Sequence, residues 1–208
     1  MRPVTNYRLT AVIQRVKSAS VTVDGQLISQ IAKGILVFAA IDKNDTPKEV
    51  ESMASKVLKV KLWEADDGTK WKKNVQEIDG EVLCVSQFTL LASTKKGNKP
   101  SFHASATPIK GKELYDQFMK KVRAEYQEER VKDGVFQAMM DVGLVNDGPV
   151  GLDYRSIDEA VTIEIETNPT EMKNPTGFSE SGGDKPEEDD TFKGHVHKTF
   201  ELPASLLE

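Results

Sequence analysis

The sequence predicts an α+β fold, in which a mostly antiparallel, barrel-like β-sheet forms the core and is accompanied by two main helices. Three observations support this prediction. Several short segments alternate apolar and polar residues and are separated by Asp-Gly turn dipeptides. Two other segments carry apolar residues at helical spacing. The chain has 208 residues, 38% of them hydrophobic, which is enough for the core of one domain.

The predicted strands are short and lie along most of the chain. They span residues 9–16, 20–23, 26–31, 34–41, 81–90, 135–145 and 160–165. Asp24-Gly25 favours a tight hairpin turn between two of them. Residues 34–41 are apolar almost throughout, which is typical of a strand that is buried on both faces.

Two helices are predicted, each from its own pattern. The first begins with a capping box formed by Thr46 and Glu49, with Pro47 at the first helical position. The following apolar residues form a single stripe: Val50, Met53, Ala54, Val57 and Leu58. The second helix is predicted over residues 111–128, where Leu114, Phe118 and Val122 recur at intervals of four.

The composition changes at residue 167 and divides the chain into two parts. Residues 167–208 contain nine acidic and four basic residues, frequent Pro, Gly and Ser, and few apolar side chains. Such a segment cannot form a core, so we predict a disordered, acidic C-terminal tail after a domain over residues 1–166. The tail carries the whole net charge of −5, and the neutral domain is therefore compatible with a polyanionic partner.

The few Cys and His residues restrict the chemistry. One Cys and three His do not make a structural zinc site, and His195 and His197 in the tail are interpreted as solvated. We predict no metal and no cofactor. The single Cys, the absence of a leader-like start and the absence of a long apolar run predict a cytoplasmic protein without membrane contact.

The sequence of the domain contains no strong candidate for catalysis by a side-chain nucleophile. His103 lies in a polar loop without a neighbouring acid, so we expect a solvated histidine. Cys84 has apolar neighbours in a predicted strand, which is typical of an inert buried thiol.

Two segments are unusual for a sheet protein. The first, Ser86-Gln87-Phe88-Thr89, places small and polar residues at the end of a buried strand and leads into a loop with Lys95, Lys96 and Lys99. The second is Gly148-Pro149, which follows an apolar strand. Gly-Pro tolerates unusual backbone geometry, and a cis bond before Pro costs only about 0.5–1 kcal/mol relative to trans. Taken singly, the two segments also fit a strand end and an ordinary turn.

Together with further stretches, these segments resemble the D-aminoacyl-tRNA deacylase family. The matching stretches follow the family's order and lie at residues 12–16, 19–25, 86–89, 99–102, 113–115 and 146–150. The resemblance covers roughly residues 8–150. It implies a homodimer that hydrolyses the ester between a D-amino acid and the 3′ end of tRNA, so that the aminoacylated 3′ end of tRNA is the partner.

The resemblance also implies roles for particular residues. Ser86, Gln87, Phe88 and Thr89 would line the reaction centre, and Phe136 and Met139 would line the amino-acid pocket. Gly148 and Pro149 would be inserted across the dimer interface with a cis bond and would screen the chirality of the substrate. Lys95, Lys96 and Lys99 are candidates for contacts with tRNA phosphates.

An aminoacyl ester is already activated, so the enzyme does not need a strong nucleophile. Our hypothesis is that water attacks with help from the ribose 2′-hydroxyl, and that each backbone N–H of residues 87–89 aimed at the oxyanion stabilises it by about 2.7–4 kcal/mol. Thr89 as a covalent nucleophile is the alternative. Rejecting an L substrate about 10⁴-fold requires about 5.5 kcal/mol. Rigid carbonyls at Gly148-Pro149 would supply this by a clash, so glycyl-tRNA should also be a substrate.

Some positions depart from the family pattern, and other functions stay open. Gly151 stands where the family usually has Thr, and Gly143 where it often has Ser. Related deacylases with a trans Gly-Pro bond accept a mischarged L-amino acid. The alternative from another class is a nucleic-acid-binding module at DNA replication origins, although the sequence contains no recognisable DNA-reading helix.

Overall fold

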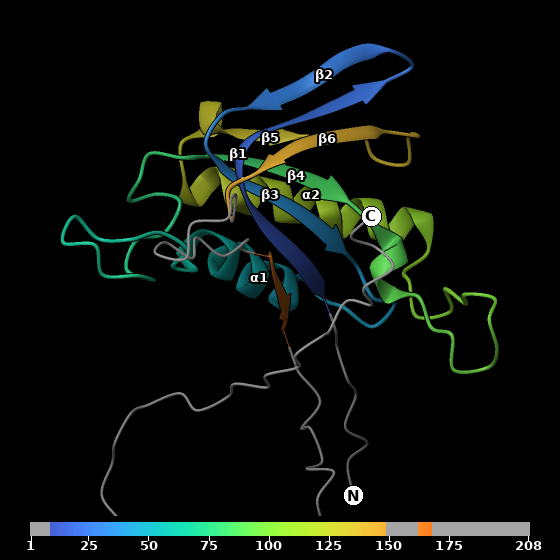
Figure 1. The fold of residues 1–208 in the computed structure, drawn as a ribbon. Coiled ribbons are helices and arrows are strands. Elements are labelled where there is room, and N and C mark those ends of the chain that lie inside the picture. The colour runs from blue at the N-terminus through green and yellow to red at the C-terminus, as the bar shows by residue number, and fades with distance from the viewer. Residues whose placement is uncertain (1–8, 149–161, 168–208) are drawn as a thin grey trace, which may run out of the picture. The chain divides into compact units, whose positions relative to one another are not determined.

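The computed structural model describes residues 9–148 and 162–167, and Figure 1 shows how their elements are arranged. In chain order these are β1 (Thr10–Val23), β2 (Gln26–Ile31), β3 (Gly34–Ala40), α1 (Pro47–Lys59), β4 (Glu81–Ser86), the 3₁₀ helix η1 (Phe88–Leu91), α2 (Pro108–Glu125), the 3₁₀ helix η2 (Glu128–Arg130), β5 (Val131–Asp133), β6 (Asp141–Asn146) and β7 (Thr162–Glu166). Residues 149–161 and the predicted tail from residue 168 onward lie outside the described residues.

The long strand β1 organises the sheet. Its first half pairs antiparallel with β3 and β7, and its second half pairs antiparallel with β2 and β6. The sequence predicts two strands here, over residues 9–16 and 20–23, but the structure has one strand of 14 residues. The register with β6 shifts between Val16 and Ser18, so β1 is irregular at this point and does not turn.

The remaining pairings are parallel, which makes the sheet mixed. β3 pairs parallel with β4, and β4 pairs parallel with β5. Each parallel pair needs a long crossover, and α1 and α2 occur in these two connections. The Ser29 hydroxyl on β2 donates a hydrogen bond to the carbonyl of Asp133 on β5, 2.5 Å away, which links the two ends of the strand order. The predicted α+β fold with a barrel-like sheet and two main helices is confirmed.

Apolar clusters lie on both faces of β3. Ile35, Val37 and Ala39 belong to a cluster that includes the buried faces of α1 and α2, whereas Leu36 belongs to a second cluster with residues of β1, β2 and β4. This explains why residues 34–41 are apolar almost throughout. At the start of β3, a Cβ added to Gly34 would lie 1.8 Å from the carbonyl oxygen of Glu81, so this close approach of two strands requires glycine.

Two predicted boundaries of secondary-structure elements are wrong, and both lie near the cavity described below. The strand predicted over residues 81–90 ends at Ser86, and Phe88–Leu91 form η1 instead. The second helix spans Pro108–Glu125 rather than 111–128, because Thr107-Pro108 starts it with proline in the first turn.

The segment after α2 also differs from the prediction. Residues 135–140 form turns rather than a strand, and Gln137 has a φ of 65°, which a regular strand does not allow. β6 therefore begins at Asp141, and the three-residue strand β5 precedes these turns without having been predicted. The last predicted strand corresponds to β7, which begins at Thr162.

Candidate active site

A cavity of about 680 Å³ lies at the carboxyl ends of β3 and β4. These strands are parallel, so their carboxyl ends meet at one edge of the sheet, which is where parallel sheets commonly bind ligands. Four segments line the cavity: residues 39–41, 85–89, 105–108 with Gly111, and 136–140 with Val142. The lining brings together two groups of residues that the sequence predicts for the site, Ser86 to Thr89 and the pair Phe136 and Met139.

The backbone at the end of β4 changes direction within the cavity. The N–H of Gln87 donates to the carbonyl of Ala39 at 2.8 Å and extends the parallel pairing by one residue. The Gln87 N–H is therefore not available to an oxyanion. Of the three backbone donors predicted over residues 87–89, only Phe88 and Thr89 remain. Phe88 and Thr89 open η1, so their N–H groups have no acceptor inside the helix, and no other described residue accepts from them. These two N–H groups are the free donors at this wall.

The Thr89 hydroxyl has an amide as its neighbour. The Gln87 side-chain Nε2 lies 2.5 Å from Thr89 Oγ1. An amide is not a base at neutral pH in either orientation of its oxygen and nitrogen. This contact therefore orients the Thr89 hydroxyl without activating it as a nucleophile.

Phe136 and Met139 belong to another segment that lines the cavity. The Phe136 ring packs against Tyr115 of α2 with 5.6 Å between ring centroids, and the Lys112 ammonium lies 5.9 Å from its centre. The ring also lies close to Gly111, where an added Cβ would be in ordinary van der Waals contact with it at 3.7 Å. Met139 is 89% exposed, so most of its side chain is free to contact a bound molecule. Aromatic and thioether groups fit an apolar substrate side chain.

Residues 105–108 form a third wall of the cavity, which was not predicted from the sequence. The Ala106 N–H donates to the carbonyl of Ile41 at 3.0 Å, and the Ser105 hydroxyl donates to the carbonyl of Phe88 at 3.4 Å. Residues 105–108 are thereby held beside the end of β4. The signal available in the sequence was Thr107-Pro108, a helix start that repeats the pattern of Thr46-Pro47.

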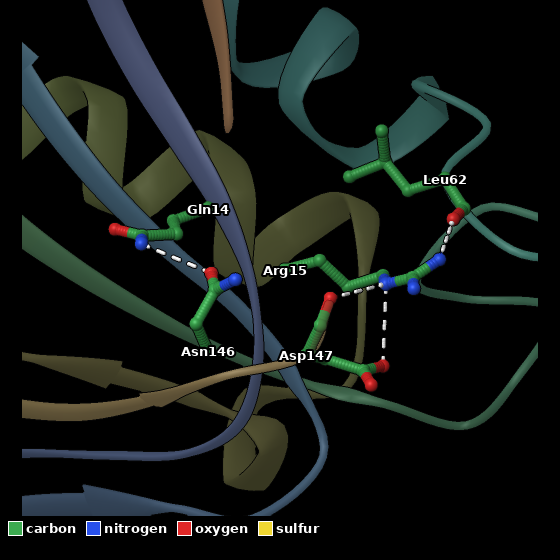
Figure 2. A network of polar contacts seen from close by, with 5 residues as sticks. All are labelled: Gln14, Arg15, Leu62, Asn146 and Asp147. Carbon is green, nitrogen blue, oxygen red and sulfur yellow. Dashed lines mark hydrogen bonds and ion pairs between the residues drawn. The ribbon is translucent and has the colours of Figure 1, made fainter. Parts of the chain in front are cut away.

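The segment that leads to Gly148 is held by a polar network (Figure 2). The Arg15 guanidinium contacts both the carboxylate and the carbonyl of Asp147, each at 3.2 Å from Nε, and donates to the carbonyl of Leu62 at 2.7 Å. Gln14 donates to Asn146 at 3.0 Å from the adjacent position of β1. The network fixes residues 146–147 on β1, immediately before Gly148.

Of the predicted Gly148-Pro149 pair, the structure describes only Gly148. Gly148 is half-buried and does not line the cavity of this chain. Pro149 and Gly151 lie outside the described residues, and so does the predicted cis bond. Gly143, the other departure from the family pattern, lies on β6, where a Cβ would approach the Ser20 hydroxyl at 3.1 Å.

Lys95, Lys96 and Lys99 are exposed on the loop that follows η1. Ser93 and Ser101 close this loop through two backbone hydrogen bonds of 2.9 Å each. The loop does not contribute to the cavity lining, so the predicted phosphate contacts would lie outside the cavity.

A buried acidic group lies behind the third wall. Asp45 is 1% exposed, and its Oδ1 has no hydrogen-bond partner among the described residues, while its Oδ2 accepts from the N–H of Asp42 at 2.7 Å. Burial is the main cause that raises the pKa of this carboxyl to about 7, and the nearby carboxylates of Asp42 and Glu49 add to it. Asp42 in turn bridges Ser105 of the cavity wall.

The structure also describes Cys84 and His103, for which the sequence predicts no catalytic role. Cys84 is fully buried, and its burial raises the pKa of the thiol far above the ordinary value, so it is inert. His103 is exposed, and its Nδ1 lies 3.0 Å from the hydroxyl of Ser101. Within residues 9–148 and 162–167, no three His, Cys, Asp or Glu side chains form a group that could hold a metal ion. In the same residues, no helix combines the length and apolar character of a membrane span.

Comparison with known proteins identifies the family. The profile of the family described as D-Tyr-tRNA(Tyr) deacylase matches residues 12–154. A D-aminoacyl-tRNA deacylase of Yarrowia lipolytica is 55% identical over 148 residues, which cover 70% of this chain and 96% of that protein.

Two solved structures are similar as well. One, named c-Myc DNA Unwinding Element Binding Protein, is 43% identical, has a TM-score of 0.67, and is matched over 75% of this chain and 97% of that chain. The other, a probable eukaryotic D-amino acid tRNA deacylase, has a TM-score of 0.62 over 76% of this chain and 99% of that chain, but its 15% identity shows the fold alone. The profile and the 55% identical relative confirm the resemblance found in the sequence: the chain belongs to the D-Tyr-tRNA(Tyr) deacylase family.

Proposed function

We propose that this chain hydrolyses the ester bond of D-aminoacyl-tRNA and releases the free D-amino acid and tRNA. The observation that carries the proposal is that Phe88 and Thr89, whose N–H groups are free, line the same cavity as the apolar Phe136 and Met139. An ester carbonyl would point at these donors, while the amino-acid side chain would lie toward Phe136 and Met139. Family membership supplies the substrate class, an aminoacylated tRNA.

The proposed chemistry uses the backbone rather than a nucleophilic side chain. Water attacks the carbonyl carbon with help from the ribose 2′-hydroxyl, and negative charge develops on the carbonyl oxygen. Each well-aimed N–H lowers the barrier by about 2.7–4 kcal/mol, so the two free donors together supply about 5–8 kcal/mol. The C–O bond to the ribose then breaks, and the ribose oxygen leaves with a proton. No step needs an acid or base from the protein.

A Thr89→Ala variant separates this mechanism from covalent catalysis by Thr89. The N–H of residue 89 is kept and only the hydroxyl is lost, so we expect the variant to keep most of the wild-type rate with D-tyrosyl-tRNA. The measurement is the release of free D-tyrosine under single-turnover conditions, with circular dichroism as the folding control. Complete loss of activity in a folded variant would contradict our mechanism and support the nucleophile.

Chiral screening belongs to the proposal as well. Gly148-Pro149 of one subunit would enter the cavity of the other and reject L side chains by a clash of main-chain atoms. The Arg15 network supports this, because it fixes the residues that precede Gly148. A filter that works by exclusion has nothing to clash with in glycine, so glycyl-tRNA should be hydrolysed. Resistance of glycyl-tRNA beside rapid cleavage of D-tyrosyl-tRNA would contradict exclusion.

The filter requires a homodimer. β6 supports this requirement: among the described residues it pairs only with β1, and its Leu144 and Val145 are 38% and 54% exposed. An open strand edge with apolar side chains is suited to association with a second copy. Sedimentation should give twice the chain mass. Translation in the cytoplasm would supply the substrate, and Lys95, Lys96 and Lys99 would bind its phosphates with an affinity that falls as salt rises.

Two other functions can be tested with the same protein. The name of the 43% identical structure motivates a DNA-binding test, in which a binder that depends on the tail would lose its DNA when residues 167–208 are removed. A deacylase should keep its turnover after that deletion. A deacylase for a mischarged L-amino acid would instead cleave an L-aminoacyl-tRNA faster than its D form.

A further inference from the structure

A buried tyrosine behind the cavity carries a polar contact that packing alone does not require. Tyr115 of α2 is 2% exposed, and its ring packs against the core residue Phe118 with 6.1 Å between ring centroids. Its hydroxyl donates to Oδ1 of Asp133 at 2.7 Å. A phenylalanine would keep the same ring in the core, and replacing both partners of a buried hydrogen bond by apolar groups can be nearly neutral for stability. The hydrogen bond therefore calls for an explanation other than the filling of the core.

The Tyr115 hydroxyl is a lasting donor to this carboxyl. Burial is the main cause that raises the pKa of Tyr115 well above its ordinary value, so the hydroxyl keeps its proton. Burial also raises the pKa of Asp133, whereas the hydrogen bond from Tyr115 and the charge of Arg123 oppose this rise. Each of the two groups is thus the partner of the other in partly dry surroundings. We call Tyr115 and Asp133 the anchor pair.

The backbone of Asp133 is held on both sides. Asp133 is the last residue of β5, and its carbonyl accepts from the Ser29 hydroxyl at 2.5 Å. The N–H of the next residue, Gly134, donates to the carbonyl of Cys84 on β4 at 3.0 Å. The carboxyl of Asp133 therefore starts from a fixed point of the sheet. Its hydrogen bond fixes the hydroxyl end of the Tyr115 ring relative to that point.

Phe136 depends on the ring that the anchor pair holds. It lies three residues after Asp133 in turns, so strand pairing does not orient it. Of the aromatic rings among the described residues, only Tyr115 packs against Phe136, with 5.6 Å between centroids and 40° between the planes. The Lys112 ammonium also lies 5.9 Å from the ring centre, but this side chain is exposed. The contacts form a closed circuit from Asp133 along the chain to Phe136 and back through Tyr115.

We propose that the anchor pair positions the Phe136 ring for contact with the side chain of the D-amino acid, and that it thereby determines how well large apolar side chains are accepted. The inference rests on the proposed function, in which Phe136 and Met139 face that side chain. We expect a side chain as large as that of tyrosine to reach Phe136, and the methyl group of alanine to be too short. Tyr115 and Asp133 are not among the described residues that line the cavity, so they act through Phe136 as positioning residues.

Tyr115→Phe tests the anchor pair, because it keeps the ring and removes only the hydroxyl. The readout is the ratio of kcat/KM for D-tyrosyl-tRNA to kcat/KM for D-alanyl-tRNA. We expect the variant to lower this ratio about five-fold, mainly through KM, because a displaced ring weakens contact with the large side chain and leaves the backbone donors in place. General damage to the fold would lower both values together. An unchanged ratio in the folded variant would overturn the proposal.

Substitutions of Asp133 test the other half of the anchor pair. Asp133→Asn keeps an oxygen that can accept from the Tyr115 hydroxyl, so it should keep the ratio within about two-fold of the wild type. Asp133→Leu has a similar size but no acceptor, so it should lower the ratio as far as Tyr115→Phe does. An unchanged ratio in folded Asp133→Leu would overturn the role of the pair.

Tyr126→Phe is the matched control. The Tyr126 hydroxyl donates to the carbonyl of Gly80 at 2.8 Å, a hydrogen bond of similar length at the end of the same helix. Tyr126 is not among the described residues that line the cavity. Its substitution should therefore leave the ratio within about two-fold of the wild type. A fall as large as that in Tyr115→Phe would overturn the assignment of the effect to the anchor pair.

A double variant tests whether Tyr115 acts through Phe136. Phe136→Leu should itself lower the ratio by about five-fold or more, and adding Tyr115→Phe should lower it no further, because residues that act as one unit are not additive. Independent effects would multiply, to about 25-fold for two five-fold losses, and would overturn the role of Tyr115 as a positioning residue for Phe136.

The failure of this inference and the failure of the proposed function are distinguishable. If the wild type releases no amino acid from either D-aminoacyl-tRNA, the proposed function fails, and a crystal structure of Tyr115→Phe still tests the positioning. In that structure the Phe136 ring should have left its place beside Gly111, and an unmoved ring would overturn the inference. If the wild type is active and the ratio does not respond to Tyr115→Phe, only the positioning inference fails.

Discussion

Asp45 makes the stability of the domain depend on pH in a direction that is unusual for a carboxylate. Its side chain is 1% exposed, and Asp42 and Glu49 add negative charge while Lys110 partly compensates. These surroundings raise the pKa to about 7, from an ordinary value of 3.8. The folded state therefore holds a proton that the unfolded chain has already released between these two pH values. The free energy of unfolding is highest below pH 4 for this group and falls as pH rises through 7.

The structure gives the magnitude of this effect. Each pKa unit corresponds to about 1.36 kcal/mol, so a rise from 3.8 to about 7 corresponds to roughly 4 kcal/mol in full. The loop around Asp45 can relax and admit water when the group ionises, so we expect about half, roughly 2 kcal/mol, to be measured. Asp45→Asn cannot ionise and keeps an oxygen for the Asp42 N–H. Between pH 5 and 8.5 only about two of these pKa units are crossed, which corresponds to roughly 3 kcal/mol in full. After the same halving, the variant should gain between about 1 and 2 kcal/mol over the wild type at pH 8.5 relative to pH 5.

Urea unfolding at pH 5, 7 and 8.5 measures this difference directly. Glu51→Gln is the matched control, because Glu51 is an exposed carboxylate on α1, the helix that begins two residues after Asp45, and its removal should leave the pH dependence unchanged. If the wild type and Asp45→Asn keep a constant difference across the three pH values, Asp45 is ionised in the folded state and the reasoning fails.

Two further predictions concern packing. Arg15→Met removes the contacts to Asp147 and Leu62 and leaves a half-buried carboxylate unpaired. The variant should therefore lower the free energy of unfolding by about 3 kcal/mol and slow the hydrolysis of D-tyrosyl-tRNA. The double variant Arg15→Met/Asp147→Asn should restore part of the stability, because it removes the unpaired carboxylate. Gly34→Ala would place a Cβ 1.8 Å from the carbonyl of Glu81, so it should destabilise the domain by about 3 kcal/mol or prevent folding; a normal urea midpoint would contradict the close strand approach.

Local signals predicted the elements that depend on local chemistry. The first helix was predicted from Thr46, Pro47 and Glu49, and the structure has this helix with its capping box. The apolar run of residues 34–41 predicted a strand buried on both faces, which β3 is. These features need no knowledge of distant partners.

Errors arose where distant contacts decide the structure. Residues 81–90 alternate well enough for one long strand, but β4 ends at Ser86, one residue before the last hydrogen bond to β3. The short strand β5 has only three residues and exists because it pairs with β4. Neither effect is visible in a local window of sequence.

The site was predicted unevenly for the same reason. Motifs identified Ser86 to Thr89 in the sequence, and the resemblance added Phe136 and Met139, which the fold brings into one cavity. The pairing of Arg15 with Asp147 joins residues 132 positions apart, and no pattern in the sequence announces it. The burial of Asp45 was missed because an acid before a helix usually indicates a solvated cap.

The most direct test of the account compares D-tyrosyl-tRNA with L-tyrosyl-tRNA as substrates of the purified full chain, by following the release of free tyrosine. The account predicts rapid hydrolysis of the D form and an L form that is at least about 10³-fold slower, equivalent to about 4 kcal/mol. Equal rates for the two forms, or faster release from the L form, would contradict it.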